Sequence, residues 1–254
     1  MLQNTFVHCP TVGPATERRL WRNGLLTWDN CLAEGAPVPR RLEGWLLPRL
    51  AESRERLAAG DFRWFAAELP RSEHWRALSE FGDRIGYLDI ETTGSSAEDS
   101  TTVVGIYDGQ TMHQFVRNEN LRDFADLLES FTAIVTFAGS SFDLPVLTRE
   151  FGVRFPQLHV DLCHVLRRIG LKGGLKSIET QLGLRRSDET TGMSGYDAVR
   201  LWWQWWNDDD EVARRNLLAY NAEDVANMQT ILQMTLPRVL RAAWGDLADQ
   251  VLGS

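Results

Sequence analysis

The sequence has few cysteines, no long apolar run and no internal repeat. Its three cysteines (Cys9, Cys31 and Cys163) are odd in number and lie outside any CxxC pair. This argues against a disulfide framework or a zinc site and fits a reducing cytoplasm. No stretch approaches the roughly 18 apolar residues that a membrane span needs, and MLQNTFVHCP at the N-terminus lacks the pattern of a secretory signal. These absences predict a cytoplasmic protein with no membrane partner.

Basic residues are outnumbered by acidic ones, and unevenly along the chain. The net charge is −8, but residues 1–80 hold 11 arginines and 10 acids, whereas the remainder holds 16 basic and 25 acidic residues. Inside that acidic part, residues 165–186 carry six basic side chains and one acid. A local patch of this kind can bind phosphates whatever the overall sign, although a solvated helix surface is an equal expectation. Charge alone leaves the partner open.

The pattern of the chain changes near residue 80. Before it, short helices are expected at 15–24, 40–60 and 61–69. After it, the pattern predicts strands at 84–91, 101–109, 111–117, 133–139 and 158–162, and helices at 120–131 (capped by Asn118 or Asn120), 143–151 and near 208–235. Three successive strands followed by helical crossovers predict a mixed α/β sheet, antiparallel and then parallel, with helices packed on it. We expect a helical segment at 1–80 and one α/β domain at 81–254.

Three short strings contain candidate site residues. Asp89 and Glu91 are two apart in YLDIETTG, so both carboxylates point to one face of the expected strand, about 7 Å apart. Asp143 follows a strand and a Gly/Ser turn in TFAGSSFDLPVL, where it could equally cap the next helix. Tyr220 and Asp224, in AYNAEDVANM, are four apart and therefore on one face of a helix. Each spacing alone is common.

In this order, the strings DIETTG, SSFDLP and YNAED resemble the three motifs of the DEDD family of 3′–5′ exonucleases, which has the ribonuclease H-like fold. Tyr220, four residues before Asp224, is typical of the tyrosine subclass. The resemblance covers roughly residues 84–235, and DLCHVLRRIGLKGGLKSIE further resembles the YprB-like bacterial branch. One departure is Ala138 in FAGSSFD, where many relatives have asparagine.

The resemblance implies a chemistry that explains the paired acids. Two Mg²⁺ or Mn²⁺ ions, which prefer carboxylate oxygens, would turn repulsion into coordination. Asp89 would bridge both ions, Glu91 and Asp224 would complete one site, and Asp143 would act through water. Tyr220 would orient the attacking water, because an ordinary tyrosine pKa of about 10 disfavours a role as base. In-line displacement would release nucleoside monophosphates from the 3′ end of single-stranded or frayed DNA or RNA.

Substrate contacts are expected beside the motifs and along the basic segment. They are assigned to Thr92, Phe142, Arg167, Arg168, Lys172 and Lys176. Gly173 and Gly174 would let main-chain amides approach a phosphate, or form an ordinary turn. Asp161 is expected to cap a helix rather than to bind metal.

Two other features are given structural roles with an open alternative. The tryptophans of LWWQWW (201–206) cannot all face one side of a helix, so some should pack on the core, although exposed ones could stack on bases. Residues 8–32 partly match a helix–hairpin–helix element around TVGPAT, where Pro14 removes an amide. That segment would hold a DNA phosphate or be a structural cap.

The main hypothesis is therefore a metal-dependent 3′–5′ exonuclease. Two alternatives remain: a non-catalytic nucleic-acid-binding module that retains the fold, and an endonuclease on the same general fold.

Overall fold

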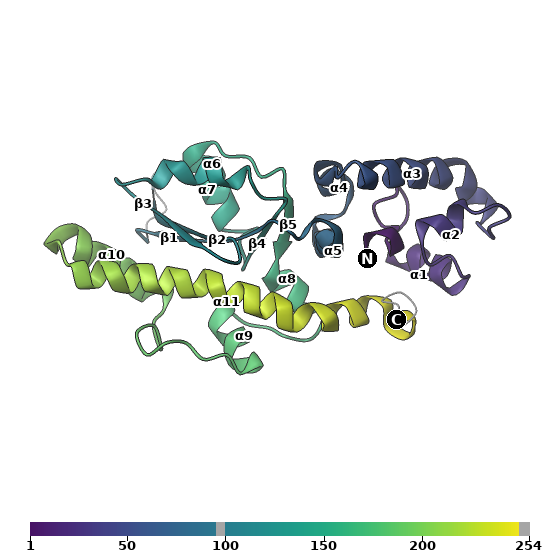
Figure 1. Ribbon diagram of the computed structural model, residues 1–254. Helices are drawn as coiled ribbons and strands as arrows, with labels where there is room; N and C mark the ends of the chain where they lie inside the picture. The colour runs from purple at the N-terminus through teal and green to yellow at the C-terminus, as the bar shows by residue number, and fades with distance from the viewer. Residues whose placement is uncertain (95–99, 249–254) are drawn as a thin grey trace.

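The computed structural model describes residues 1–94 and 100–248 and is centred on a five-stranded sheet, in the order β3-β2-β1-β4-β5 (Figure 1). The strands are β1 (Ile85–Thr92), β2 (Thr101–Tyr107), β3 (Met112–Val116), β4 (Ala133–Thr136) and β5 (Leu158–Asp161). Strands β1, β2 and β3 pair antiparallel, and β4 and β5 join in parallel on the other side of β1. The mixed α/β sheet expected from the sequence is therefore confirmed. Short connections reverse the chain direction between β1, β2 and β3, whereas helical crossovers place β4 and β5 parallel to β1.

Helices cover both faces of the sheet (Figure 1). On one face lie α6 (Phe124–Leu128) and α7 (Asp143–Phe151), which share a buried apolar cluster with β1 and β2. On the other face lies α11, 34 residues long, and with it α8, α9 and α10. These elements are α8 (Leu162–Arg167), α9 (Leu175–Leu182), α10 (Gly195–Asp208) and α11 (Glu211–Trp244). The helix expected at 120–131 is shorter than predicted, since the 3₁₀ helix η3 (Leu121–Asp123) forms its first part.

Strand β1 divides its side chains between these two faces. Leu88 and Ile90 are buried in the cluster with α6 and α7, whereas Tyr87 belongs to the cluster that contains Val225 of α11. Because side chains alternate along a strand, Asp89 and Glu91 share the face of Tyr87. Both acids therefore point toward α11 and away from the apolar cluster on the opposite face.

The N-terminal segment is helical, as expected, and packs against the edge strand β5. Its elements are η1 (Leu2–Asn4), α1 (Pro14–Arg22), α2 (Trp28–Leu32), α3 (Arg40–Ala58), α4 (Phe62–Glu68), η2 (Arg71–Ala77) and α5 (Leu78–Phe81). One buried cluster continues from this segment into the sheet. At the far end of α11, Trp244 contacts the rings of Trp21 and Trp75, with centroids 6.3 and 6.5 Å apart. Helix α11 thus links the N-terminal segment and the sheet (Figure 1). The predicted domain boundary between residues 80 and 81 stays a prediction.

A buried ion-pair network also holds the N-terminal segment together. Arg76 is paired with Glu17 at 2.9 Å and with Glu73 at 2.6 Å, and all three side chains are at most 7% exposed.

Around TVGPAT, the 3₁₀ helix η1 lies before the turn and α1 after it. Exposed arginines of α1 leave the binding of a DNA phosphate there as a prediction.

The four tryptophans of α10 separate as the helical period requires. Trp202 is buried, and Trp203 and Trp206 are 42% and 47% exposed. Trp202 stacks on Trp206 with centroids 5.3 Å apart, so most of this aromatic surface is used in packing. None of the helices in the described part is both long and apolar enough to cross a membrane.

Candidate active site

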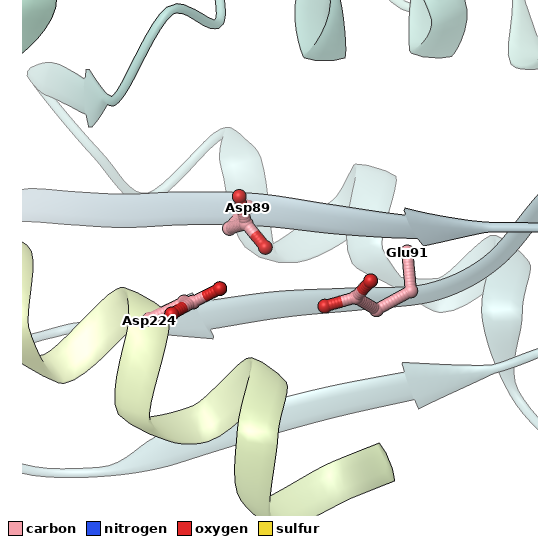
Figure 2. Close-up of side chains that lie close together, drawn as sticks. All are labelled: Asp89, Glu91 and Asp224. Atoms are coloured by element: carbon pink, nitrogen blue, oxygen red, sulfur yellow. The ribbon is translucent and has the colours of Figure 1, made fainter. Parts of the chain in front are cut away.

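Three carboxylates from distant parts of the chain converge between β1 and α11. Asp89 and Glu91 come from β1 and Asp224 from α11, and Figure 2 shows them pointing toward one another. Within the described residues, one oxygen of each lies within 4.8 Å of the others. The strand alternation and the helix position together produce this group, since neither element alone carries all three acids.

The fourth predicted acid, Asp143, lies against β1 but outside that group of three. Its carboxylate is buried, and Oδ1 accepts a hydrogen bond from the amide of Ile90 at 3.1 Å. Phe142, rather than Asp143, occupies the N-cap position of α7. The main chain of Ile90, between Asp89 and Glu91, therefore ties Asp143 to the strand that carries the first two acids.

Burial and mutual repulsion raise the pKa of these acids. Burial is the largest cause for Asp89 and Glu91, and the next is repulsion, from Asp143 on Asp89 and from Asp224 on Glu91. Burial likewise raises the pKa of Asp143 to about 7, and it raises that of Asp224 although Arg186 opposes the shift. The metal-free site therefore disfavours the ionised forms, and a cation would relieve that penalty.

The chemistry of these side chains fits a hard divalent cation. Oε1 of Glu91 is buried and has no hydrogen-bond partner among the described residues. The group of three offers carboxylate oxygens and no histidine or cysteine. Oxygen ligands of this kind suit Mg²⁺ and Mn²⁺, so Asp89, Glu91 and Asp224 could hold such an ion.

Tyr220 lies one helical turn before Asp224 on α11. Its hydroxyl accepts a hydrogen bond from Nζ of Lys176 at 2.9 Å, and that nitrogen lies 4.4 Å from the ring centroid. Burial, and next the charge of Asp224, raise the pKa of Tyr220. The hydroxyl is therefore protonated at neutral pH and available to orient a water. Lys176, a predicted substrate contact, is brought to the site by α9.

Arg186 neutralises the site on the α11 side. Its side chain is 7% exposed, and Nη2 pairs with Asp224 and, at 2.7 Å, with Glu179. Its Nε donates to the other oxygen of Glu179 at 2.7 Å. Sequence reasoning missed this role, because nothing distinguished Arg186 from the exposed Arg185 beside it. The signal available was Glu179, the one acid in the basic segment.

Asn221 positions the first acid, and sequence reasoning missed it as well. Its buried Nδ2 donates to Oδ2 of Asp89 at 3.2 Å. Gly105, which pairs with Asp89 across β1 and β2, leaves the room for this contact: a Cβ there would lie 2.1 Å from Oδ1 of Asn221. The signal was the place of Asn221 inside YNAED, directly after Tyr220.

The other predicted substrate contacts have different surroundings. Thr92 ends β1 at a register irregularity directly after Glu91, and Phe142, next to Asp143, is 49% exposed. Both are therefore next to site acids in the chain. Their contact with a substrate stays a prediction.

The predicted contacts Arg167, Arg168 and Lys172, at the end of α8 and just after it, differ in their partners. Arg167 and Lys172 are exposed. Arg168 pairs with Glu73 and donates to the carbonyl of Ser72 at 3.0 Å, which ties α8 to the N-terminal segment. A structural partner thus accounts for Arg168, and a substrate contact by any of the three stays a prediction.

The turns before α8 and α9 contain Asp161 and the glycine pair, and all three residues help to start a helix. Asp161 accepts a hydrogen bond from the amide of Cys163 at 3.0 Å and is the N-cap of α8, as predicted. Gly174 is the N-cap of α9, and Gly173 has φ of +122°, so both take part in a helix-initiating turn. An approach of their amides to a phosphate stays a prediction.

Ala138, where the resemblance led us to expect asparagine, has an unfavourable backbone conformation. Its φ is +62°, in the left-handed region, and its amide donates to Asp161 at 2.9 Å. Asparagine and glycine tolerate this region far better than alanine. Asparagine would therefore suit the backbone at this position better than alanine does.

Ala138→Gly should stabilise the protein by about 0.5–1 kcal/mol, because glycine adopts the left-handed conformation without strain. Urea denaturation with EDTA would measure the change. Ala242→Gly, at an exposed position inside α11, should lower stability by about 1 kcal/mol. An equal loss in both variants would contradict the strain at Ala138.

The mixed sheet, with acids on its central strand facing a C-terminal helix, defines a ribonuclease H-like protein. The chain belongs to the RNase_H superfamily, because the model of this family matches residues 86–236, more than half of the sequence. The match begins in β1 and ends inside α11, so it contains all four acids and Tyr220. Membership implies a nucleic-acid substrate.

A solved structure has the same fold. It is the family B DNA polymerase from the hyperthermophilic archaeon Pyrobaculum calidifontis, with a TM-score of 0.51 and 16% identity. The alignment covers 67% of this chain and 27% of the polymerase chain. At this identity the similarity concerns the fold alone. A comparison with curated protein sequences found no match.

Proposed function

We propose that this protein is a metal-dependent 3′–5′ exonuclease that hydrolyses the terminal phosphodiester bond of single-stranded or frayed nucleic acid. The observation that carries the proposal is the convergence of Asp89, Glu91 and Asp224 beside Tyr220. Asp143, held against β1, supplies the fourth acid of the tyrosine-subclass pattern.

The proposed roles follow from the contacts of each side chain. Asp89, Glu91 and Asp224 would hold two Mg²⁺ or Mn²⁺ ions, and Asp143 would act through water. When bound, such ions activate a water nucleophile and stabilise the charge on the leaving 3′ oxygen. Tyr220, protonated and held by Lys176, would orient the water. Asn221 would keep Asp89 in place.

The paired Arg186 and Asp224 bear on the alternative of a non-catalytic module. The guanidinium already neutralises one of the metal-binding acids. Binding of a cation to Asp224 would therefore require sharing or displacement of this ion pair. A test of the exonuclease must therefore vary the metal concentration, since weak metal binding alone would make the protein inactive.

The test uses 5′-labelled DNA and RNA oligomers with free or blocked 3′ ends, and circular forms of each. With Mg²⁺ or Mn²⁺, we expect stepwise shortening from free 3′ ends, and with EDTA no shortening. Cleavage of blocked or circular substrates would show an endonuclease instead. Binding without hydrolysis under every metal condition would favour the non-catalytic module.

A further inference from the structure

A cavity of about 670 Å³ lies between the N-terminal helical segment and the edge of the sheet. One wall is formed by α4 and η2, and the other by α7, the loop that follows it and β5. The walls touch at β5, where the amide of His159 donates to Nδ1 of His74 at 2.9 Å. Figure 1 shows β5 as the strand next to α4 and α5.

Four arginines line this cavity. Arg63 comes from α4, Arg71 from η2, Arg149 from α7 and Arg154 from the loop after α7. All four are exposed. Segments far apart in the sequence therefore place positive charge around one hollow, which we call the arginine groove.

The charge of the arginine groove is largely uncompensated. No carboxylate is found among the described residues that line it. Arg149 pairs with Glu150 at 3.2 Å, whereas Arg63, Arg71 and Arg154 make no ion pair within residues 1–94 and 100–248. In a chain with a net charge of −8, this concentration of unpaired arginines points to an anionic ligand.

The two buried histidines in the wall add no charge at neutral pH. Burial lowers the pKa of His159 to about 4 and lowers that of His74 as well. His159 is hydrogen-bonded to Thr136 at 2.9 Å, in addition to its contact with His74. The histidines thus support the wall, and the arginines provide the binding charge.

The arginine groove includes two residues that follow one acid of the proposed site along the chain. Leu144 and Pro145, which line it, directly follow Asp143 on α7. Ser140, in the turn before Asp143, lines both this cavity and a neighbouring hollow of about 320 Å³ that reaches His164. Helix α7 extends about 13 Å at 1.5 Å per residue, so its lining face leads away from Asp143 toward Arg149.

We propose that the arginine groove binds the phosphate backbone of the nucleic-acid strand whose 3′ end lies at the acidic site. This inference rests on the proposed function. Arginine guanidinium groups match phosphate oxygens in a bidentate geometry, and contacts of this kind position a strand without reading its sequence. In a protein with a net charge of −8, the groove would thereby give the strand a path of positive charge. A ligand limited to one phosphate would leave most of the four arginines unused.

The experiment compares a 15-mer with a dinucleotide of the nucleic acid that the wild-type protein degrades in Mn²⁺. The variant is Arg71→Ala/Arg154→Ala. The control is Arg215→Ala/Arg238→Ala, which removes two exposed arginines of α11 that do not line the groove and make no ion pair with any described residue. Melting temperatures of both variants check folding.

In the groove variant, we expect the ratio of kcat/KM on the 15-mer to that on the dinucleotide to fall about tenfold, through a higher KM on the 15-mer. The slope of log KM for the 15-mer against log salt concentration should fall by about 1.4. Each phosphate contact on a single strand contributes about 0.7 to this slope, and the variant removes two. The control should retain the wild-type ratio.

An unchanged ratio would overturn the inference while the exonuclease stands. So would an equal loss on both substrates, which would place these arginines at the acidic site or in folding. Arginine-dependent binding of polyglutamate with an unchanged ratio would indicate an acidic protein partner instead. If the wild-type protein degrades no oligomer in any metal, the proposed function fails and this inference fails with it.

Discussion

Asp89→Asn should reduce exonuclease turnover by at least about 10³-fold, equivalent to about 4 kcal/mol of transition-state stabilisation. Asparagine keeps the size of the side chain and one acceptor oxygen but removes the charge that would hold the cations. The assay is shortening of a 3′-free oligomer in Mn²⁺. Asp83→Asn, at an exposed position six residues earlier, should keep wild-type activity.

Asp89→Asn should also make the metal-free protein more stable above about pH 4. Burial and neighbouring acids raise the pKa of Asp89 in the folded state. In the unfolded chain the pKa of this carboxyl is about 3.9. Below that pH both states are protonated and no penalty exists. As the pH rises, the unfolded chain loses its proton first, so wild-type stability falls. Asparagine removes this fall.

Urea denaturation in EDTA at pH 4, 6 and 8 measures this effect. The stability difference between Asp89→Asn and the wild type should be smallest at pH 4 and grow toward pH 8. Added Mn²⁺ should stabilise the wild type and not the variant. A variant that is less stable at pH 8, or that gains equal stability from Mn²⁺, would contradict a metal site at Asp89.

Arg186→Met should lower the free energy of unfolding of the metal-free protein by about 3–5 kcal/mol. Methionine retains much of the length but leaves Glu179, 3% exposed, and Asp224, 9% exposed, without the guanidinium that pairs with both. Arg185→Met, next to it on the surface and without an ion pair in the described part, should change stability by less than about 0.5 kcal/mol.

Urea denaturation in EDTA at pH 7.5 compares these two variants. Mn²⁺ should narrow the gap between Arg186→Met and the wild type, because a cation can replace the guanidinium at Asp224. Adding Glu179→Gln to Arg186→Met should also recover part of the loss. A loss below about 1 kcal/mol would mean that Glu179 and Asp224 do not depend on this partner.

Much of the fold follows from local patterns in the sequence. Alternation around Asp89 and Glu91 correctly predicted that both acids share a face of β1, and the Pro/Gly-broken helices before residue 80 are present. The four-residue spacing of Tyr220 and Asp224 lies inside α11, as expected. These predictions succeed because strand and helix periods are properties of consecutive residues.

Other features depend on contacts that no local pattern contains. The extent of α11 as far as Trp244 depends on packing against Trp21 and Trp75, more than 160 residues earlier in the chain. Similarly, Asp161 holds the turn at Ala138 across 23 residues. Sequence reasoning left these contacts out because they are made across the tertiary structure.

The sequence by itself determined which face of a strand or helix each candidate side chain occupies; the chemistry of these side chains stays a prediction. Only the tertiary structure decided that Arg186 neutralises Asp224, that Asn221 holds Asp89 in the space left by Gly105, and that arginines of separate segments surround one groove. The physical reason is that periodicity orients a residue on its own element, whereas its partner is set by how distant elements pack.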